Sequence, residues 1–543
     1  MRQPPVEPGS EPDPDTEPGL GLEAQRRAVS ALCRALGAQR IETHISFVLL
    51  AGGFAYKLKK VVNLGFVDFT TLARRRFYCD EELRLNRRTA PELYLDVLPL
   101  TGSAERPQLG GGGAAIDWVL RMRAFAQDGL WDRLAAHGGL HAAHIDAGVE
   151  ALCALHRQAA VAAADDPVGQ ATQVRAPLRD SLQALQSMCR AEDERAELAR
   201  LQQWEAVAFD ALRQPFEQRR RDGCVRECHG DLHLGNVTQF EGRTTLFDCL
   251  EFSAALRWTD VMSDLGFIAM DLRAHGLPRL SQRFVNAYLE RSGDWAGLRV
   301  LRYYLVHRAL VRAKVAALRG AQLASGDAQF AHESRTLRHY LDVALEYSRP
   351  ATPALMLTHG FSGSGKTLLT QSLLELCGAI RLRADVERKR LFGLDARASS
   401  DAALKPQLYS EAATQATHAR LREAATWALQ GGFSVILDAT FLSRAQRQQA
   451  SAQAARLGVR FAVIHFEASV PTLRERVRQR ALHGDDASEA DVAVLEEQLA
   501  QAQPLLDEER ESVFVFDAEA AYDAAAMPER WAPLLRRLGL SEG

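Results

Sequence analysis

Short apolar runs alternate with longer amphipathic stretches over the last third of the chain. The runs are rich in Leu, Val, Ile and Phe, which predicts strands, and the stretches between them have the apolar spacing of helices. The predicted strands are Ala354–Thr358, Ala379–Arg383, Ser434–Leu437, Phe461–Phe466 and Val513–Phe516. Strands separated by helices predict an α/β domain built on a doubly wound parallel sheet.

The first 350 residues follow a different pattern. Strands are predicted at His44–Leu50, Ala55–Val62, Leu93–Leu100 and Ile116–Phe125, and early helices at Leu22–Leu36 and Leu72–Thr89. Apolar spacing is helical through most of Leu130–Arg220 and again over Asp260–Tyr347. This order predicts an α+β part in which a small mixed lobe precedes a mostly helical lobe.

Composition sets the expected boundaries. Residues 1–22 are rich in Pro, Glu and Asp and lack an apolar core, so we expect a disordered acidic tail. Residues 23–347 then form the first domain and residues 354–543 the second. Between them, residues 348–353 contain two prolines in six positions, which is typical of a linker.

Length and charge restrict the class of protein. A chain of 543 residues is too long for one core, and 47% hydrophobic with 25% charged residues is usual for a soluble globular protein. A net charge of −3 gives no overall field that favours nucleic acid or membranes. No apolar run is long enough to span a bilayer, and the N-terminus has no apolar core, so we expect no signal peptide. We therefore expect a cytoplasmic protein whose eight cysteines are reduced thiols.

A glycine-rich loop follows the strand predicted at Ala354–Thr358. It fits the pattern G-x-x-x-x-G-K-[ST] with Gly360, Phe361, Ser362, Gly363, Ser364, Gly365, Lys366 and Thr367. Glycines allow a tight turn whose backbone N–H groups point at phosphate oxygens, and the following helix adds its positive end. Lys366 would reach the β- and γ-phosphates of ATP, and Thr367 would bind Mg²⁺. The pattern predicts a P-loop.

Other polar residues follow the later strands of this half. Asp438 ends an apolar strand and can hold Mg²⁺ directly or through water, although a turn aspartate would look the same. Asp385 lies beyond a strand end, where it can orient an acceptor hydroxyl, and Arg388 can bind an anionic acceptor or the γ-phosphate. Arg476 and Arg480 share a helix face and can offset charge in the transition state. A helix cap and a solvated surface are the simpler alternatives.

A second motif, H-x-D-x-x-x-x-N, lies at His229–Asn236, directly after Cys228. In a kinase catalytic loop, the aspartate accepts the proton of the substrate hydroxyl and the asparagine binds Mg²⁺, which here are Asp231 and Asn236. Twelve residues beyond Asn236, Asp248 ends a strand-like run, as expected of a second Mg²⁺ ligand. These motifs predict a second kinase site.

The same stretch allows a competing interpretation. Cys224, Cys228, His229 and His233 have the spacing C-x₃-C-H-x₃-H, and these side chains can bind zinc. The spacing is not that of common zinc fingers, and zinc would leave Asp231 and Asn236 unexplained.

These motifs resemble those of two families. Residues 352–543 resemble small P-loop kinases of the polynucleotide kinase, gluconate kinase and zeta-toxin type. Residues 23–345 resemble aminoglycoside phosphotransferases and choline kinases. The whole chain is similar to bacterial proteins that join such a phosphotransferase domain to an AAA-type or zeta-toxin-like P-loop kinase domain. The resemblance to aminoglycoside phosphotransferases and choline kinases implies that Asp260 and Asp264 brace the catalytic loop.

A kinase small lobe also implies a lysine on a strand and a glutamate on a helix. Lys57 and Lys59 share one strand face; Lys57 is favoured because the preceding Phe-Ala-Tyr makes it the more interior. Glu81 or Glu82 can pair with it. No G-x-G-x-x-G precedes the lysine, and a Cys-Leu pair follows Asp248 in place of Phe-Gly.

The leading hypothesis is an ATP- and Mg²⁺-dependent phosphotransferase with two kinase modules and a small-molecule acceptor. A nucleotide or nucleic-acid end stays open as an acceptor. In the alternative, the first domain is a pseudokinase that binds a ligand and regulates the second. A third hypothesis is an ATPase that couples hydrolysis to a partner.

Overall fold

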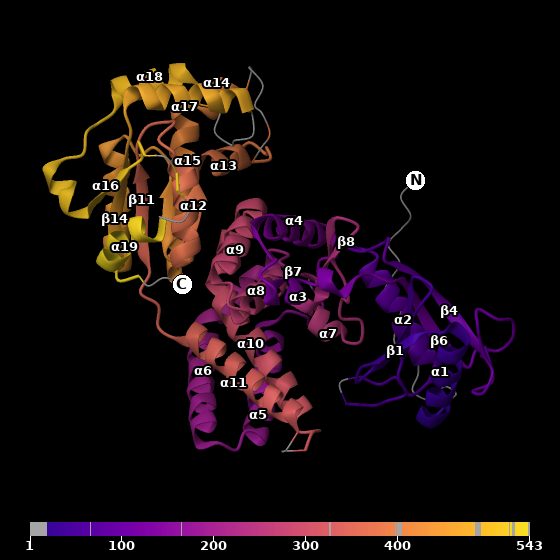
Figure 1. Ribbon diagram of the computed structural model, residues 1–543. Helices are drawn as coiled ribbons and strands as arrows, with labels where there is room; N and C mark the ends of the chain where they lie inside the picture. The colour runs from indigo at the N-terminus through magenta and orange to yellow at the C-terminus, as the bar shows by residue number, and fades with distance from the viewer. Residues whose placement is uncertain are drawn as a thin grey trace. The chain divides into compact units, whose positions relative to one another are not determined.

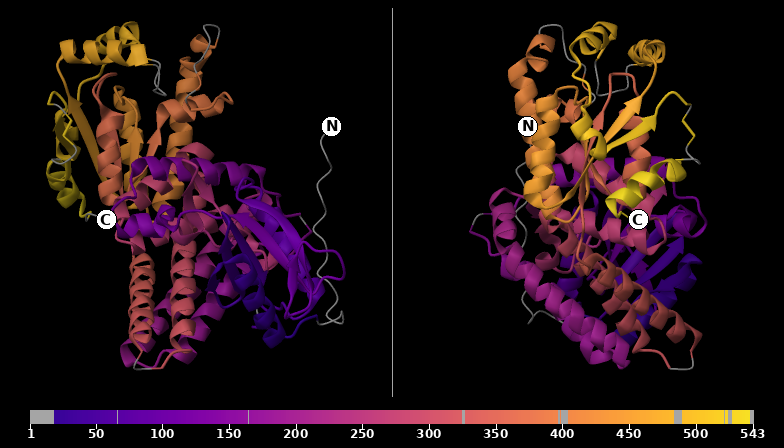
Figure 2. Two further views of the ribbon diagram at one scale, coloured as in Figure 1. Left: turned by 45° about the vertical axis from the view of Figure 1, so that its right-hand side comes forward. Right: turned by 90° about the vertical axis from the view of Figure 1, so that its left-hand side faces the viewer.

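A computed structural model describes residues 19–540, apart from 66, 164, 325–326, 397, 399–403, 484–489, 521 and 524–526. Most of the predicted tail therefore lies outside the described residues. The chain forms two compact units, which are described separately (Figures 1 and 2). The first unit comprises Met1–Gly169 and Arg220–Asp264, and the second comprises Gln170–Arg219 and Leu265–Gly543. The predicted linker falls inside the second unit, and the domain limits stay predictions.

An antiparallel six-stranded sheet forms the small lobe of the first unit. Its order is β1 (Gln39–Glu42), β2 (Ser46–Ala51), β3 (Phe54–Lys59), β6 (Asp117–Arg123), β4 (Tyr94–Gly102) and β5 (Pro107–Leu109). Four of these strands match the prediction, and the short β1 and β5 were not predicted. Gly52 and Gly53 have left-handed φ values of 58° and 80° and close the predicted hairpin between β2 and β3.

Two helices are fixed to this sheet by a buried polar cluster. Helix α1 (Leu22–Leu36) contributes Gln25, and α2 (Leu72–Asn86) contributes Arg75. The carboxylate of Asp117 on β6 accepts hydrogen bonds from Arg75 Nε at 2.7 Å and from Gln25 Nε2 at 2.7 Å. All three side chains are fully buried, so each relies on the others for its hydrogen bonds.

We expect Asp117→Ala to destabilise the first unit by about 3–5 kcal/mol, because Arg75 would become a buried, unpaired charge. Chemical denaturation followed by circular dichroism measures this loss. Glu105→Ala is the matched control, since Glu105 pairs with Arg27 at 3.6 Å on the surface and such pairs contribute less than about 1 kcal/mol. Equal losses in the two variants would contradict the prediction.

The remainder of the first unit places the predicted catalytic loop between two small sheets. Strand β7 (Val225–Glu227) pairs with β10 (Trp258–Asp260), and β8 (Val237–Phe240) pairs with β9 (Arg243–Leu246). The helical elements around them are η1 (Gln127–Gly129), α3 (Trp131–Ala136), α4 (Ala142–Gln158), η2 (Leu234–Asn236), α7 (Ala254–Arg257) and the start of α8 (Val261–Ala274). The loop at 228–236 follows β7 and leads into β8.

The second unit contains a helical part and a five-stranded sheet. The helical part comprises α5 (Ala171–Met188), α6 (Glu192–Arg221), α9 (Pro278–Ser292), η3 (Trp295–Gly297), α10 (Leu298–Gly320) and α11 (Ala328–Ser348). Helices α10 and α11 pack along each other (Figure 1).

All five strands of that sheet are parallel. Their order is β12 (Ile380–Arg383), β13 (Val435–Asp438), β11 (Ala354–His359), β14 (Arg460–Glu467) and β15 (Val513–Asp517). The connecting elements are α12 (Lys366–Cys377), α13 (Ala384–Leu391), α14 (Lys405–Leu408), α15 (Glu411–Gln430), α16 (Arg444–Leu457), α17 (Val470–His483), α18 (Val492–Gln501) and η4 (Asp507–Ser512), with α19 (Met527–Leu538) at the end. The predicted α/β and α+β fold classes are confirmed.

A buried core fixes the central strand β11. Trp531 of α19 stacks on Phe516 with ring centroids 4.3 Å apart, and both pack in one cluster with Met356 of β11 and Leu373 of α12. This packing holds the carboxyl end of β11, from which the glycine-rich loop emerges. A membrane-spanning segment would need a long, weakly charged apolar helix, and none occurs in the described part of the chain.

Candidate active sites

The glycine-rich loop joins β11 to α12 in the second unit. Gly360, Gly363 and Gly365 have φ values of 150°, 85° and 75°, which residues other than glycine rarely adopt. A Cβ atom on Gly363 would also lie 2.7 Å from the carbonyl oxygen of Leu473 in α17. All three glycines are therefore required by the backbone conformation, and Gly363 is also required by the close packing of α17.

Lys366 opens α12 and folds back over this loop. Its Nζ donates to the carbonyl oxygens of Gly360 at 2.9 Å and Phe361 at 2.7 Å, and to Ser364 Oγ at 3.2 Å. Burial lowers the pKa of Lys366 to about 8, against the opposing effect of the nearby Asp438 and Asp385 carboxylates. The ammonium group is thus held at the mouth of the loop.

Thr367 and Asp438 meet beside Lys366. The Thr367 hydroxyl donates to Asp438 Oδ2 at 2.8 Å, and Asp438 is the last residue of β13, the neighbour of β11. Parallel strands end at one edge of the sheet, which is why a motif at 367 and an acid at 438 come together. Hydroxyl and carboxylate oxygens are the hard ligands that Mg²⁺ prefers.

Asp385 and Arg388 lie in the first turns of α13, directly after β12. Arg388 Nη1 is 3.4 Å from Asp385 Oδ1, and the Arg388 guanidinium lies 5.0 Å from the centroid of the Tyr409 ring. The Asp385 charge is also among those that raise the pKa of Lys366. The structure therefore brings the predicted acceptor-binding pair to the same strand ends as the P-loop.

The two predicted arginines of α17 differ in position. The positive charge of Arg480 lowers the pKa of Lys366, and its Nη2 donates to the Ala490 carbonyl at 2.7 Å. Arg476 instead donates to the Ala518 carbonyl at 2.8 Å, beside the end of β15. Of the pair, Arg480 has the electrostatic link to the loop.

Gln498 contacts the P-loop but was not predicted. Its Oε1 accepts the backbone N–H of Ser362 at 2.9 Å, and its Nε2 donates to Ser362 Oγ at 3.1 Å. Gln498 lies on α18, which packs against α17. No local sequence signal could reveal it, because 136 residues separate the two partners.

Two histidines face each other across the last register pair of β11 and β14. His359 Nδ1 and His465 Nδ1 lie 2.8 Å apart, so one ring donates and the other accepts a single hydrogen bond. Burial lowers the pKa of His359 to about 3, and burial also lowers the pKa of His465. Both rings are therefore neutral at pH 7.

The lowered pKa values of this histidine pair predict that the folded protein loses stability in acid. Between about pH 6.5 and 3, the unfolded chain binds a proton at His359 that the folded chain does not, so stability falls as pH falls through that window. At pH 5 the loss is about 2 kcal/mol. His359→Asn should narrow the gap between thermal midpoints at pH 7.5 and pH 5, whereas exposed His137→Asn should leave the gap unchanged. An unaltered gap in His359→Asn would refute this account.

The second candidate site lies in the first unit, where Lys57 of β3 meets Glu82 of α2. Lys57 Nζ is 2.7 Å from Glu82 Oε1 and 2.8 Å from Asp248 Oδ1. Glu81 instead forms ion pairs with Arg84 and Arg257. Of the alternatives left open by the sequence, the geometry favours Lys57 with Glu82.

The burial of Lys59 contradicts the sequence prediction that Lys57 is the more interior lysine. The Lys59 side chain is 1% exposed against 16% for Lys57, so Lys57 is not the more interior of the two. Lys59 pairs with the second carboxylate oxygen of Glu82 and with Glu251. What distinguishes Lys57 is its contact with Asp248. The partner of Lys59, Glu251, was missed because it lies beyond the recognised motif.

Asp231, Asn236 and Asp248 surround the end of the catalytic loop. Asn236 Nδ2 donates to the Asp231 carbonyl at 2.8 Å and lies 3.4 Å from Asp231 Oδ2. Asp248 has a left-handed φ of 60°, and its backbone N–H donates to the Tyr94 hydroxyl at 3.1 Å. The nearby Lys57 lowers the pKa of Asp248 against the effect of burial. A backbone held in this uncommon conformation is typical of functional positions.

Asp264 braces this loop. Its two carboxylate oxygens accept the backbone N–H groups of His229 at 2.7 Å and Gly230 at 2.9 Å, and His156 Nε2 lies 3.2 Å from Oδ2. Asp260 accepts the Met262 N–H at 2.9 Å at the start of α8. The Asp264 contacts are of the kind that the bracing role implies, whereas the Asp260 contact lies at the start of α8 and not on the loop.

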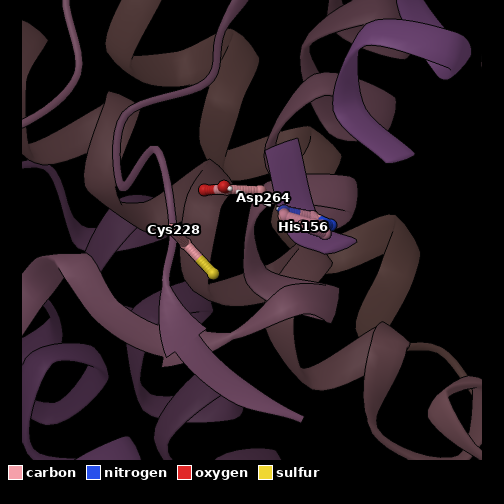
Figure 3. A group of neighbouring side chains, drawn as sticks. All are labelled: His156, Cys228 and Asp264. Atoms are coloured by element: carbon pink, nitrogen blue, oxygen red, sulfur yellow. Dashed lines mark hydrogen bonds and ion pairs between the residues drawn. The ribbon is translucent and has the colours of Figure 1, made fainter. Parts of the chain in front are cut away.

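Figure 3 shows His156, Cys228 and Asp264, the group of potential metal ligands found among the described residues. The predicted zinc quartet does not form such a group there. His229 Nε2 is bonded to the Phe247 carbonyl at 2.9 Å, and His233 Nδ1 accepts the Gly235 N–H at 3.1 Å. The zinc interpretation therefore has no geometric support.

Two family models match separate parts of the chain. A family model described as a phosphotransferase enzyme family matches residues 112–301, and one described as an AAA domain matches residues 355–505. These two matches support a phosphotransferase enzyme that also carries an AAA domain.

A protein of Mycobacterium tuberculosis described as uncharacterized is 31% identical over 456 residues, which is 84% of this chain and 88% of that protein. The same figures hold for a protein of Mycobacterium bovis. The chain belongs to the family of these mycobacterial proteins.

Solved structures are similar to each half. A choline/ethanolamine kinase family protein from Mesorhizobium loti is 13% identical, with 59% of this chain and 99% of that chain covered and a TM-score of 0.33. A gluconokinase from Sinorhizobium meliloti is 21% identical, with 35% and 95% covered and a TM-score of 0.24.

Proposed function

We propose that the second unit transfers the γ-phosphoryl group of ATP to a hydroxyl group of a small molecule, and that the first unit holds a separate ATP site of the same reaction class. The domains would be residues 23–347 and 354–543, joined by 348–353. The observation that supports the proposal most is the P-loop geometry, in which Lys366 bonds to the loop carbonyl oxygens and the Thr367 hydroxyl meets Asp438 at 2.8 Å.

The residues of the P-loop site suit an in-line transfer. The loop N–H groups and Lys366 would bind the phosphates, and Asp385 would orient the acceptor hydroxyl. As the bond from the γ-phosphorus to the ADP oxygen breaks, a bond to the acceptor oxygen forms, and the hydroxyl proton passes to Asp385. Arg388 and Arg480 would offset the charge on the transferred group.

The oxygen donors at both sites fit Mg²⁺. Thr367 and Asp438 would hold it in the second unit, and Asn236 and Asp248 in the first. When bound, Mg²⁺ neutralises charge on the phosphate oxygens. In the first unit, Lys57 fixed by Glu82 would bind phosphate, and Asp231 would accept the acceptor proton.

The regulatory alternative gives the first unit a ligand-binding role without catalysis. The close contacts of Lys57 with Glu82 and Asp248 favour the catalytic interpretation, because a pseudokinase has no need to keep this ion-paired set. The ATPase alternative predicts release of phosphate without a phosphorylated acceptor.

A screen of the full chain with γ-labelled ATP tests the proposal. The acceptors are sugars, gluconate, nucleosides, nucleic-acid ends and aminoglycosides, each with Mg²⁺. Label is expected in at least one acceptor. If only inorganic phosphate carries label with every acceptor, the kinase proposal fails and the ATPase hypothesis gains.

A further inference from the structure

Helix α9 presents a row of polar side chains to the sheet of the second unit. Gln282, Asn286 and Glu290 are spaced four residues apart and so lie on one face. Asn286 Oδ1 accepts the backbone N–H of Arg381 at 2.7 Å, and Glu290 Oε1 is 3.2 Å from Arg383 Nη1. Both partners belong to β12, the edge strand of the sheet, so α9 covers that edge.

Helix α9 also contacts α13, the helix that carries Asp385 and Arg388. Arg390 Nη2 donates to the backbone carbonyl of Glu290, and Arg390 Nη1 pairs with Glu387. One carboxylate oxygen of Glu387 also accepts Trp295 Nε1–H at 3.0 Å.

Arg420 of α15 completes this cluster. Its Nε donates to the other oxygen of Glu387 at 2.5 Å. The Glu387 side chain is fully buried, and Trp295 is 1% exposed. A buried carboxylate with three directional partners has one permitted position, which in turn fixes the helix that bears it.

We propose that Trp295, which lies well before the P-loop in the chain, is a positioning residue for the acceptor site of the P-loop kinase. The indole N–H holds Glu387, and Glu387 sets the rotation of α13 and therefore the direction of Asp385 and Arg388. The helical segment α9–η3 thus forms part of the framework of that site. This inference rests on the proposed function insofar as α13 binds the acceptor.

Trp295 would act on the acceptor site through Glu387, and this route decides which property its substitution changes. The Trp295 indole N–H donates to Glu387 and not to the phosphate-binding loop. Loss of the indole N–H should therefore disturb acceptor orientation while leaving the ATP-binding loop intact. Misorientation of a reacting group by a fraction of its contact distance is enough to slow transfer.

Hydrogen exchange followed by mass spectrometry tests the contact without any ligand. In full-length Trp295→Phe, which keeps an aromatic side chain of smaller volume and removes the N–H donor, amides of 384–391 should exchange about tenfold faster, because a hydrogen bond to a charged group is lost. Amides of 354–367 should keep their rates. Trp204→Phe is the control, since Trp204 stacks on Tyr303 at 6.0 Å in the same unit. Unchanged exchange at 384–391, or equal loosening at 354–367, would overturn the inference.

Kinetics separate positioning from general destabilisation. With D-gluconate or another acceptor labelled in the screen, the acceptor KM of Trp295→Phe should rise about tenfold while the KM for ATP stays unchanged. An equal rise in both constants, or no change in either, would contradict a positioning role. If no acceptor is labelled, the proposed function fails alone, and the exchange experiment still decides the structural claim.

Discussion

Lys366→Ala should lower phosphoryl transfer at the P-loop site about 100- to 1,000-fold, because it removes the ammonium group that would offset charge on the transferred phosphate. Label transferred from γ-labelled ATP by the full chain measures the loss. The site should remain folded, since the Lys366 ammonium group bonds to oxygens of its own loop.

Lys314→Ala serves as the control for that variant. Lys314 is a lysine of the same unit, on α10 and far along the chain from the loop. Its replacement should leave transfer within about twofold of the wild type, as is usual for substitutions outside a site. If Lys366→Ala retains full activity, the P-loop has no catalytic part.

Asp231→Asn should lower transfer at the first site about 100- to 10,000-fold, because an amide cannot accept the proton of the acceptor hydroxyl. The shape of the side chain is kept, so the Asn236 hydrogen bond to the Asp231 backbone carbonyl should persist. Asp80→Ala is the matched control, since Asp80 forms a surface ion pair with Arg76. The measurement is label transfer in a Lys366→Ala background, where only the first site contributes.

The two substitutions together separate the hypotheses. Two independent active sites predict that each variant loses a different part of the activity. If Asp231→Asn changes nothing while Lys366→Ala abolishes all turnover, the first unit is regulatory. If Asp231→Asn alters the rate at the P-loop site, the two sites are linked.

Much of the fold could be predicted from local sequence. Strand and helix patterns gave both fold classes, because buried parallel strands and amphipathic helices have distinct periods. The residues of each motif could also be identified from the sequence, since Gly360 to Thr367 and His229 to Asn236 are continuous in the chain. Asp385 and Asp438 could be placed because they directly follow predicted strands.

Contacts that span long intervals could not be predicted. Gln498 reaches Ser362 from another helix, and Lys59 proved more buried than Lys57 although both share one strand face. The β-strand period says which residues point the same way, but it does not say which of them a partner helix covers. The link from Trp295 to Glu387 has the same origin: neither residue carries a local signal of its partner.

The contact of α9 with the edge of β12 has a consequence for how such chains evolve. Three pairs make the contact: Asn286 accepts from the backbone of Arg381, Glu290 pairs with Arg383, and Trp295 donates to Glu387. A substitution on either side alters the fit of both, so selection must act on them jointly. Recombination that exchanged the P-loop portion between distant relatives would unite mismatched surfaces, and lineages should therefore inherit the two portions as one block.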